Sequence, residues 1–218
     1  MTDFSSDLID NPSTRCACML VLDTSGSMSG TAINELNKGV AHFIEAVQQD
    51  EVASCSVEVG IISAGGNVRI ELPFTTAMNI DGIPTLNATG STPLGQATTL
   101  ALQCLDERKY EYQQAGVAYY QPWLVIISDG EPTDEYQNIA QQVKNLSEQR
   151  KLVVLPLAVA GANLNKLSEF SSRGAKKLDG LKFSEFFEWL SASMSRVSAS
   201  ASTSAGVQLP STDSWDSI

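Results

Sequence analysis

The stretch Met19-Leu20-Val21-Leu22-Asp23-Thr24-Ser25-Gly26-Ser27 joins a short apolar run to a loop of oxygen-bearing side chains. Four consecutive apolar residues predict a strand that is buried on both faces, as in a parallel sheet covered by helices. Asp23, Ser25 and Ser27 alternate directly after this strand, and Gly26 permits a tight turn between the serines. Because open α/β sheets bind ligands at the carboxyl ends of their strands, this loop is the first candidate site.

The pattern D-x-S-x-S alone does not separate a ligand site from ordinary turn or helix-cap chemistry. Two other segments favour the ligand site. Thr92 stands just before a helix that begins at Pro93, and a second apolar strand, 123–128, ends in Asp129-Gly130.

The rest of the chain alternates strand-like and helix-like segments. We predict strands at 15–22, 54–62, 68–72, 124–128, 152–160 and 175–178. We also predict helices. One begins near Thr31, one spans 93–111, one ends near Gln149, and two more span 163–170 and 183–197. The second and third strands form a hairpin, and the third is an antiparallel edge because Pro73 ends it.

This order predicts an α/β fold, a doubly wound, Rossmann-like sheet with helices on both faces. The sheet has six strands and is mostly parallel, with one antiparallel edge strand. The first and fourth strands are neighbours at the point where the strand order reverses, so Asp23 and Asp129 converge there.

Two strand-end aspartates, two serines and a threonine, in this order, resemble the metal-ion-dependent adhesion site of von Willebrand factor A (VWA) domains. The five residues are Asp23, Ser25, Ser27, Thr92 and Asp129, and the resemblance covers roughly residues 14–197. It implies that the serines bind a divalent ion directly, the threonine directly or through water, and the aspartates mainly through waters and hydrogen bonds. Oxygen-only ligands suit Mg²⁺ first, and then Mn²⁺ or Ca²⁺.

A site built chiefly from neutral hydroxyls leaves the cation electrophilic, so an Asp or Glu from a partner protein can complete its coordination. The expected function is therefore protein binding and not a reaction. The alternative is a metal-dependent phosphohydrolase that uses metal-bound water as nucleophile. Against it, Ser25 occupies the position where a phosphotransferring aspartate usually has a second Asp, and there is no P-loop, dinucleotide fingerprint or G-x-S-x-G elbow.

Three segments also resemble the bacterial TerY group of VWA proteins, which is linked to tellurite resistance and stress responses. They are residues 20–30, 128–134 and 186–193. The resemblance implies a scaffold in a signalling system with a protein kinase and a PP2C-type phosphatase.

Composition and net charge limit the classes of partner, and the cellular compartment, that we expect for this chain. A net charge of −11 and a pI near 4.4 argue against nucleic acid, which would require Lys and Arg clusters. No apolar run is long enough to span a membrane, and the first 13 residues have no signal-peptide pattern, so a cytoplasmic protein is expected. Four cysteines without a C-x₂-C pair, and a single His, predict reduced core thiols and no zinc site.

The chain divides into a flexible lead (1–13), one domain (14–197) and a Ser/Thr-rich tail (198–218) that we predict to be disordered. The tail is either a phosphoacceptor, whose added charge could bind an Arg cluster, or a plain solvated extension. Tyr119, Tyr120 and Trp123 lie at the end of the sheet opposite the metal loops. They either pack under the loop there or form a second contact surface.

Overall fold

The computed structural model describes residues 8, 10–159, 161–204 and 206–216. Six strands form one sheet in the order β3-β2-β1-β4-β5-β6, and each neighbouring pair is parallel except β2 with β3. The strands are β1 (Cys16–Asp23), β2 (Val57–Gly65), β3 (Asn67–Thr76), β4 (Trp123–Ser128), β5 (Val153–Ala158) and β6 (Lys176–Lys177). The predicted fold class, including the antiparallel edge strand, is confirmed.

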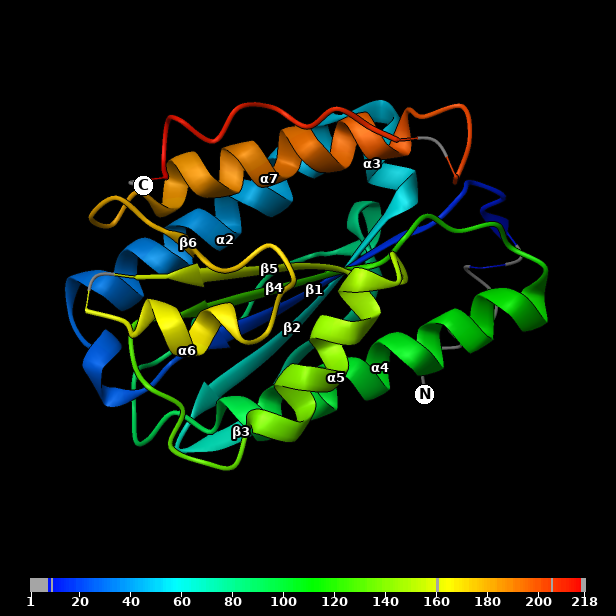
Figure 1. The fold of residues 1–218 in the computed structure, drawn as a ribbon. Helices are drawn as coiled ribbons and strands as arrows, with labels where there is room; N and C mark the ends of the chain where they lie inside the picture. Colours follow the sequence, from blue (N-terminus) through cyan, green and yellow to red (C-terminus); the bar gives the residue numbers. More distant parts are fainter. Residues whose placement is uncertain (1–7, 9, 160, 205, 217–218) are drawn as a thin grey trace.

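Helices cover both faces of this sheet (Figure 1). They are α2 (Thr31–Gln49), α3 (Glu51–Ser56), α4 (Leu94–Ala115), α5 (Gln137–Glu148), α6 (Leu164–Ser168) and α7 (Phe183–Ser198), with 3₁₀ turns η1 (Gly26–Met28) and η2 (Ala77–Asn79). Helices α2 and α7 lie on one face and α4, α5 and α6 on the other. Alternate β1 residues serve the two cores, so Leu20 and Leu22 face α2 and α7 while Met19 and Val21 face α4 and α5.

All six predicted strands are present with boundaries shifted by up to four residues, and two of these shifts have a clear local cause. Residues 54–56 end the short helix α3, which forms because the Asp50 side chain accepts hydrogen bonds from the backbone N–H groups of Val52 and Ala53. Pro73 lies inside β3 and does not end it. An edge strand tolerates proline because the missing N–H can face outward.

A buried group of charges ties β1, β2 and α4 together. The Arg108 guanidinium donates to both carboxylate oxygens of Glu58, at 2.6 and 2.8 Å, and the Tyr112 hydroxyl donates to Glu58 at 2.6 Å. Arg15 Nε lies 3.7 Å from the same carboxylate, and both of these side chains are fully buried. Burial, together with the Glu58 charge, raises the pKa of Tyr112. The alternation of apolar and polar residues in β2 did not indicate this buried group of charges.

The C-terminal segment differs from the disordered tail that its composition predicts. Residues 206–216 run back along α7 (Figure 1). Trp215 is fully buried, with its ring centroid 5.1 Å from Phe186 and 5.3 Å from Trp189. Its carbonyl accepts a hydrogen bond from the Asp179 N–H at 2.8 Å. The Ser-rich average masks this anchor, and the buried indole adds to the hydrogen bonds and the ion pair that offset the ordering entropy of the segment.

Most of the predicted N-terminal lead, residues 1–7 and 9, lies outside the described residues. Leu8 is buried under the α4 side of the sheet, and the Asn11 amide donates to the Cys55 carbonyl at 2.8 Å. In the described residues, no helix is both long and apolar enough to cross a membrane.

The four cysteines are free. Cys16 and Cys18 are fully buried on β1, and Cys55 and Cys104 are partly exposed. Burial, helped by the Glu58 charge, raises the pKa of the Cys16 thiol to about 12.

Candidate metal centre

The carboxyl ends of β1 and β4 lie side by side because these strands are parallel neighbours, with Leu22 paired to Ile127. The loops that follow them therefore meet at one edge of the sheet. The segment before α4, which carries Thr92, approaches the same place: the N–H of Gly26 donates to the Gly90 carbonyl at 2.9 Å.

Asp23 lies at the bottom of the site and is fully buried. One carboxylate oxygen accepts from the Ser25 N–H at 2.8 Å, and the other accepts from the Ser128 hydroxyl at 2.5 Å. Burial raises the pKa of Asp23, and the nearby charge of Asp129 raises it further, while the hydrogen bonds from Ser128 and Ser25 oppose this shift. The folded chain thus holds Asp23 where its ionised form is costly without a neighbouring cation.

The serines connect the two aspartates. The hydroxyls of Ser25 and Ser27 lie 2.9 Å apart, and Ser27 Oγ donates to Asp129 Oδ1 at 2.8 Å. Ser25 is buried and Ser27 is exposed, so this series of hydrogen-bonded side chains runs from the interior to the solvent.

Thr92 completes the group. A Cβ placed on Gly130 would lie 3.5 Å from Thr92 Oγ1 and 4.0 Å from Asp23 Oδ2, so both oxygens face the same small space. The structure therefore brings all five predicted residues together: Asp23, Ser25, Ser27, Thr92 and Asp129.

Sequence reasoning missed the residues that hold Thr92 in place. Thr133 accepts from the Thr92 N–H through its hydroxyl (3.1 Å) and donates its own N–H to the Thr92 carbonyl (2.9 Å). The Asp134 carboxylate accepts from the N–H groups of Gly95 (3.0 Å) and Gln96 (2.8 Å), which caps α4. This cap comes from some 40 positions downstream, so no local spacing could reveal it.

Ser128 was also missed, although it ends a predicted strand next to Asp129. Its hydroxyl orients Asp23 through the hydrogen bond described above. On the outer side of the site, Glu131 accepts hydrogen bonds from Asn163 (2.8 Å) and Lys166 (2.6 Å), which ties the loop after β4 to the region of α6.

Gly90 allows two of these loops to touch. Its φ is +69°, and a Cβ there would lie 2.5 Å from the Gly66 Cα. We expect Gly90→Ala to lower the free energy of unfolding by about 1–3 kcal/mol, because it adds both backbone strain and a backbone clash. Urea unfolding measures this. Gly82→Ala is the matched control, since its Cβ would meet nothing within 4 Å, and an equal loss in both variants would contradict the expected clash.

The donor set fits a hard divalent cation. Two carboxylates and three hydroxyls offer only oxygen ligands. A cation at this position would remove the electrostatic cost of placing Asp23 beside Asp129. Across the described ranges, no three His, Cys, Asp or Glu side chains gather as a metal site, so a site here depends on the hydroxyls.

Comparison with known proteins identifies the family of this chain. The model of the von Willebrand factor type A domain matches residues 18–186. Among solved structures, the chain is similar to the pilus adhesin SpaC of Lactobacillus rhamnosus GG, with 12% identity, a TM-score of 0.65, and coverage of 84% of this chain and 30% of that one. No curated protein matches the sequence.

Two other structures show the same fold. Proximal thread matrix protein 1 from the mussel byssus is 13% identical, with a TM-score of 0.59 over 83% of this chain and 46% of that one. BatB from Bacteroides thetaiotaomicron is 17% identical, with a TM-score of 0.56 over 81% of this chain and 95% of that one. This chain spans less than half the length of the mussel protein and of SpaC. The family model covers well over half of the sequence, and the chain belongs to the von Willebrand factor type A domain family.

Proposed function

We propose that this chain is a non-enzymatic, metal-dependent protein-interaction module that binds a partner carboxylate. In this proposal Asp23, Ser25, Ser27, Thr92 and Asp129 hold Mg²⁺, with Mn²⁺ or Ca²⁺ as substitutes. The observation that carries it is the convergence of three hydroxyls and two carboxylates at one strand-end edge. Membership of a family whose domains often mediate protein interactions supports it.

The chemistry follows from the donor types. The ion, when bound, would supply an electrophilic centre with a coordination position open to an Asp or Glu of another protein. The serine and threonine hydroxyls would leave most of its charge unneutralised, and the buried Asp23 would anchor it from below. Ser27, which is exposed, marks the side from which a partner could approach.

The partners are a further part of the proposal. Similarity to the TerY group suggests a cytoplasmic scaffold in a bacterial stress or tellurite-resistance system, with a protein kinase and a PP2C-type phosphatase as neighbours. Among the similar structures, one is described as a pilus adhesin, which supports a binding role in general terms and no particular partner.

Metal titration tests the site. We expect Mg²⁺ binding, followed by isothermal titration calorimetry, to weaken by about 10–100-fold or more in Ser25→Ala and Ser27→Ala, since losing even an outer-shell partner costs this much. Ser29→Ala is the matched control, because Ser29 is an exposed serine close by in sequence and outside the proposed ligand set. Equal Mg²⁺ affinity in all four proteins would contradict the assignment.

The wild type and Asp23→Ala test what the site does. Capture of the candidate kinase and phosphatase in Mg²⁺, lost in EDTA and in Asp23→Ala, would support the binding function. Hydrolysis of p-nitrophenyl phosphate is measured in parallel. Metal-dependent turnover that disappears in Asp23→Ala would replace the proposal with a phosphohydrolase.

A further inference from the structure

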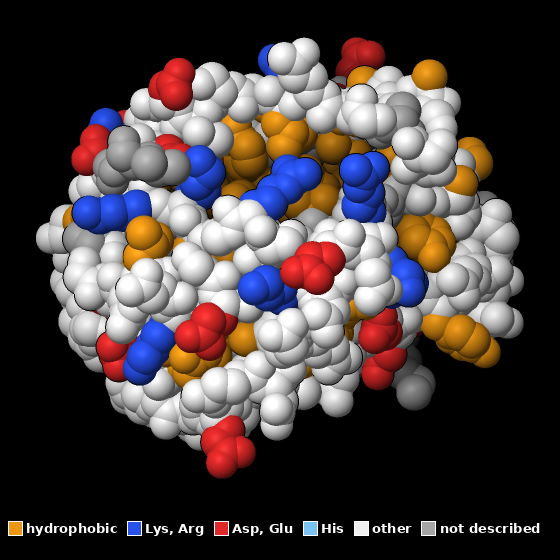
Figure 2. Space-filling view, viewed as in Figure 1, with side chains coloured by type: hydrophobic (Ala, Val, Ile, Leu, Met, Phe, Trp, Pro, Cys, Tyr) orange, Lys and Arg blue, Asp and Glu red, His pale blue; other side chains and the backbone are white. Residues whose placement is uncertain are grey.

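A cavity of about 580 Å³ lies at the end of the sheet opposite the candidate metal centre. It is bounded by the starts of β4 and β5, by α7, and by the C-terminal segment that runs along α7. Figure 2 shows it as an apolar hollow bordered by Lys and Arg side chains. This volume is in the range of small-molecule sites, about 300–1,000 Å³.

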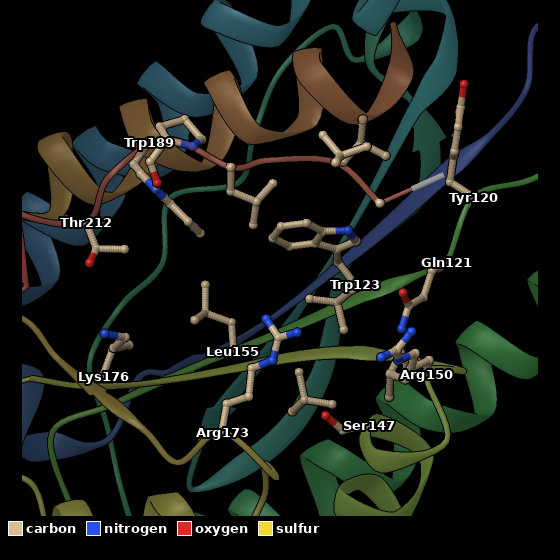
Figure 3. Close-up of a pocket in the computed structure, with 18 of the residues that line it drawn as sticks. Tyr120, Gln121, Trp123, Ser147, Arg150, Leu155, Arg173, Lys176, Trp189 and Thr212 are labelled. Atoms are coloured by element: carbon tan, nitrogen blue, oxygen red, sulfur yellow. The ribbon is translucent and has the colours of Figure 1, made fainter. Parts of the chain in front are cut away.

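The lining combines an apolar chamber with a cationic border. The chamber contains Trp123, Leu155, Trp189 and Leu209, and the border contains Arg150 and Arg173. Figure 3 shows the Arg173 guanidinium pointing into the cavity below Trp123, with Arg150 at the side next to Gln121. The ring centroids of Trp123 and Trp189 lie 6.4 Å apart.

The charge around this cavity is opposite to that of the whole chain. Its described lining residues include no Asp or Glu, although the chain carries a net charge of −11. Lys176 pairs with Asp216 at 2.6 Å. Arg150 and Arg173 are both exposed, and neither forms an ion pair within the described part of the chain. Two arginines without carboxylate partners at the mouth of an apolar chamber favour an anionic ligand.

The edge of β5 does not favour an added peptide strand. The bond from the Leu178 N–H to the Ala158 carbonyl shows that even-numbered residues of β5 direct their backbone groups to this edge. There the Val154 carbonyl already accepts from the Ser171 hydroxyl at 3.1 Å, and Pro156 has no N–H to donate. An extended peptide would therefore find few backbone partners, whereas a compact ligand needs none of them.

We propose that this cavity binds a small anionic amphiphile. Its apolar body would pack against Trp123 and Leu155, and its carboxylate or phosphate head would accept hydrogen bonds from Arg150 and Arg173. The planar guanidinium groups suit either head because both present paired oxygens. This site is independent of the metal centre and of the function proposed for it.

Tryptophan fluorescence provides a direct assay, because the chain has three tryptophans and two of them line the cavity. The probes are decanoate, decyl phosphate and decanol, which share one chain and differ in the head group. We expect decanoate or decyl phosphate to bind about tenfold or more tightly than decanol, as charge-assisted hydrogen bonds predict. The ranking of the two anions identifies which head the arginines prefer.

The double variant Arg150→Gln/Arg173→Gln should lose this preference and bind all three probes with the affinity of decanol. Arg69→Gln is the control, because Arg69 is an exposed arginine on β3, outside the cavity lining. Equal binding of the three probes to the wild type, or a preference that survives in the double variant, would overturn the proposal. So would an acidic decapeptide that competes at a lower concentration than either anion.

Discussion

Glu58→Gln is expected to lower the free energy of unfolding by about 3–5 kcal/mol, the typical cost of breaking a buried ion pair from one side. The Glu58 carboxylate is fully buried and accepts hydrogen bonds from Arg108 and Tyr112, with Arg15 3.7 Å away. Glutamine keeps the shape but removes the charge, so the buried Arg108 guanidinium would keep only the half-exposed Glu111 as its carboxylate partner among the described residues. The buried Arg15 would lose the nearby charge of Glu58. Urea unfolding followed by circular dichroism measures the loss.

The matched control is Glu35→Gln, which breaks the surface pair of Glu35 with Lys38 at 2.7 Å. Exposed pairs contribute about 0–1 kcal/mol, so little change is expected there. If the two variants lost the same amount, the stabilising role of the buried group would be wrong. A second check is Arg108→Leu in the Glu58→Gln background, which should recover part of the loss because it removes a buried charge that has lost its buried partner.

Trp215→Ala is expected to release the C-terminal segment from α7. Truncating a fully buried Trp costs about 3–5 kcal/mol. The remaining contacts are single polar bonds of about 0.5–3 kcal/mol each: Arg196 donates to the Gln208 carbonyl, Trp189 donates to the Pro210 carbonyl, and Lys176 pairs with Asp216. Thermolysin digestion with mass spectrometry would detect this release as rapid cleavage before Val207 or Leu209.

Trp215→Phe separates the apolar contact from the indole N–H. In the described residues, the buried Trp215 Nε1 has no hydrogen-bond partner, so phenylalanine forfeits no hydrogen bond. We therefore expect it to protect the segment nearly as well as tryptophan. Fast cleavage of wild type and both variants alike would show that the segment is not docked in solution.

The sheet could be predicted because its strands are short apolar runs that alternate with amphipathic helices. The run 19–22 and the run 123–128 are fully buried strands, as expected. The convergence of Asp23 and Asp129 follows from parallel neighbours at the reversal of strand order, which topology rules alone supply. What those rules cannot supply is the identity of the ion or partner.

The residues that sequence reasoning missed act over long separations. Thr133 and Asp134 bind the Thr92 region from 41 and 39 positions away, and Glu58 meets Arg108 across 50 positions. Such pairs have no periodic signature, because nothing in a local window shows which distant polar group a side chain will find. Trp215 was missed for another reason: an average over 198–218 conceals a single buried aromatic residue.

The placement of the thiols sets the order in which oxidants can act on the folded chain. Cys16 and Cys18 lie sealed within the central strand, and the raised pKa of Cys16 keeps it as the unreactive thiol. Oxidation of thiols by peroxide in the native protein must therefore begin at Cys55 or Cys104, which are partly exposed. The thiols of the strand that leads into Asp23 would stay reduced for as long as the sheet remains folded.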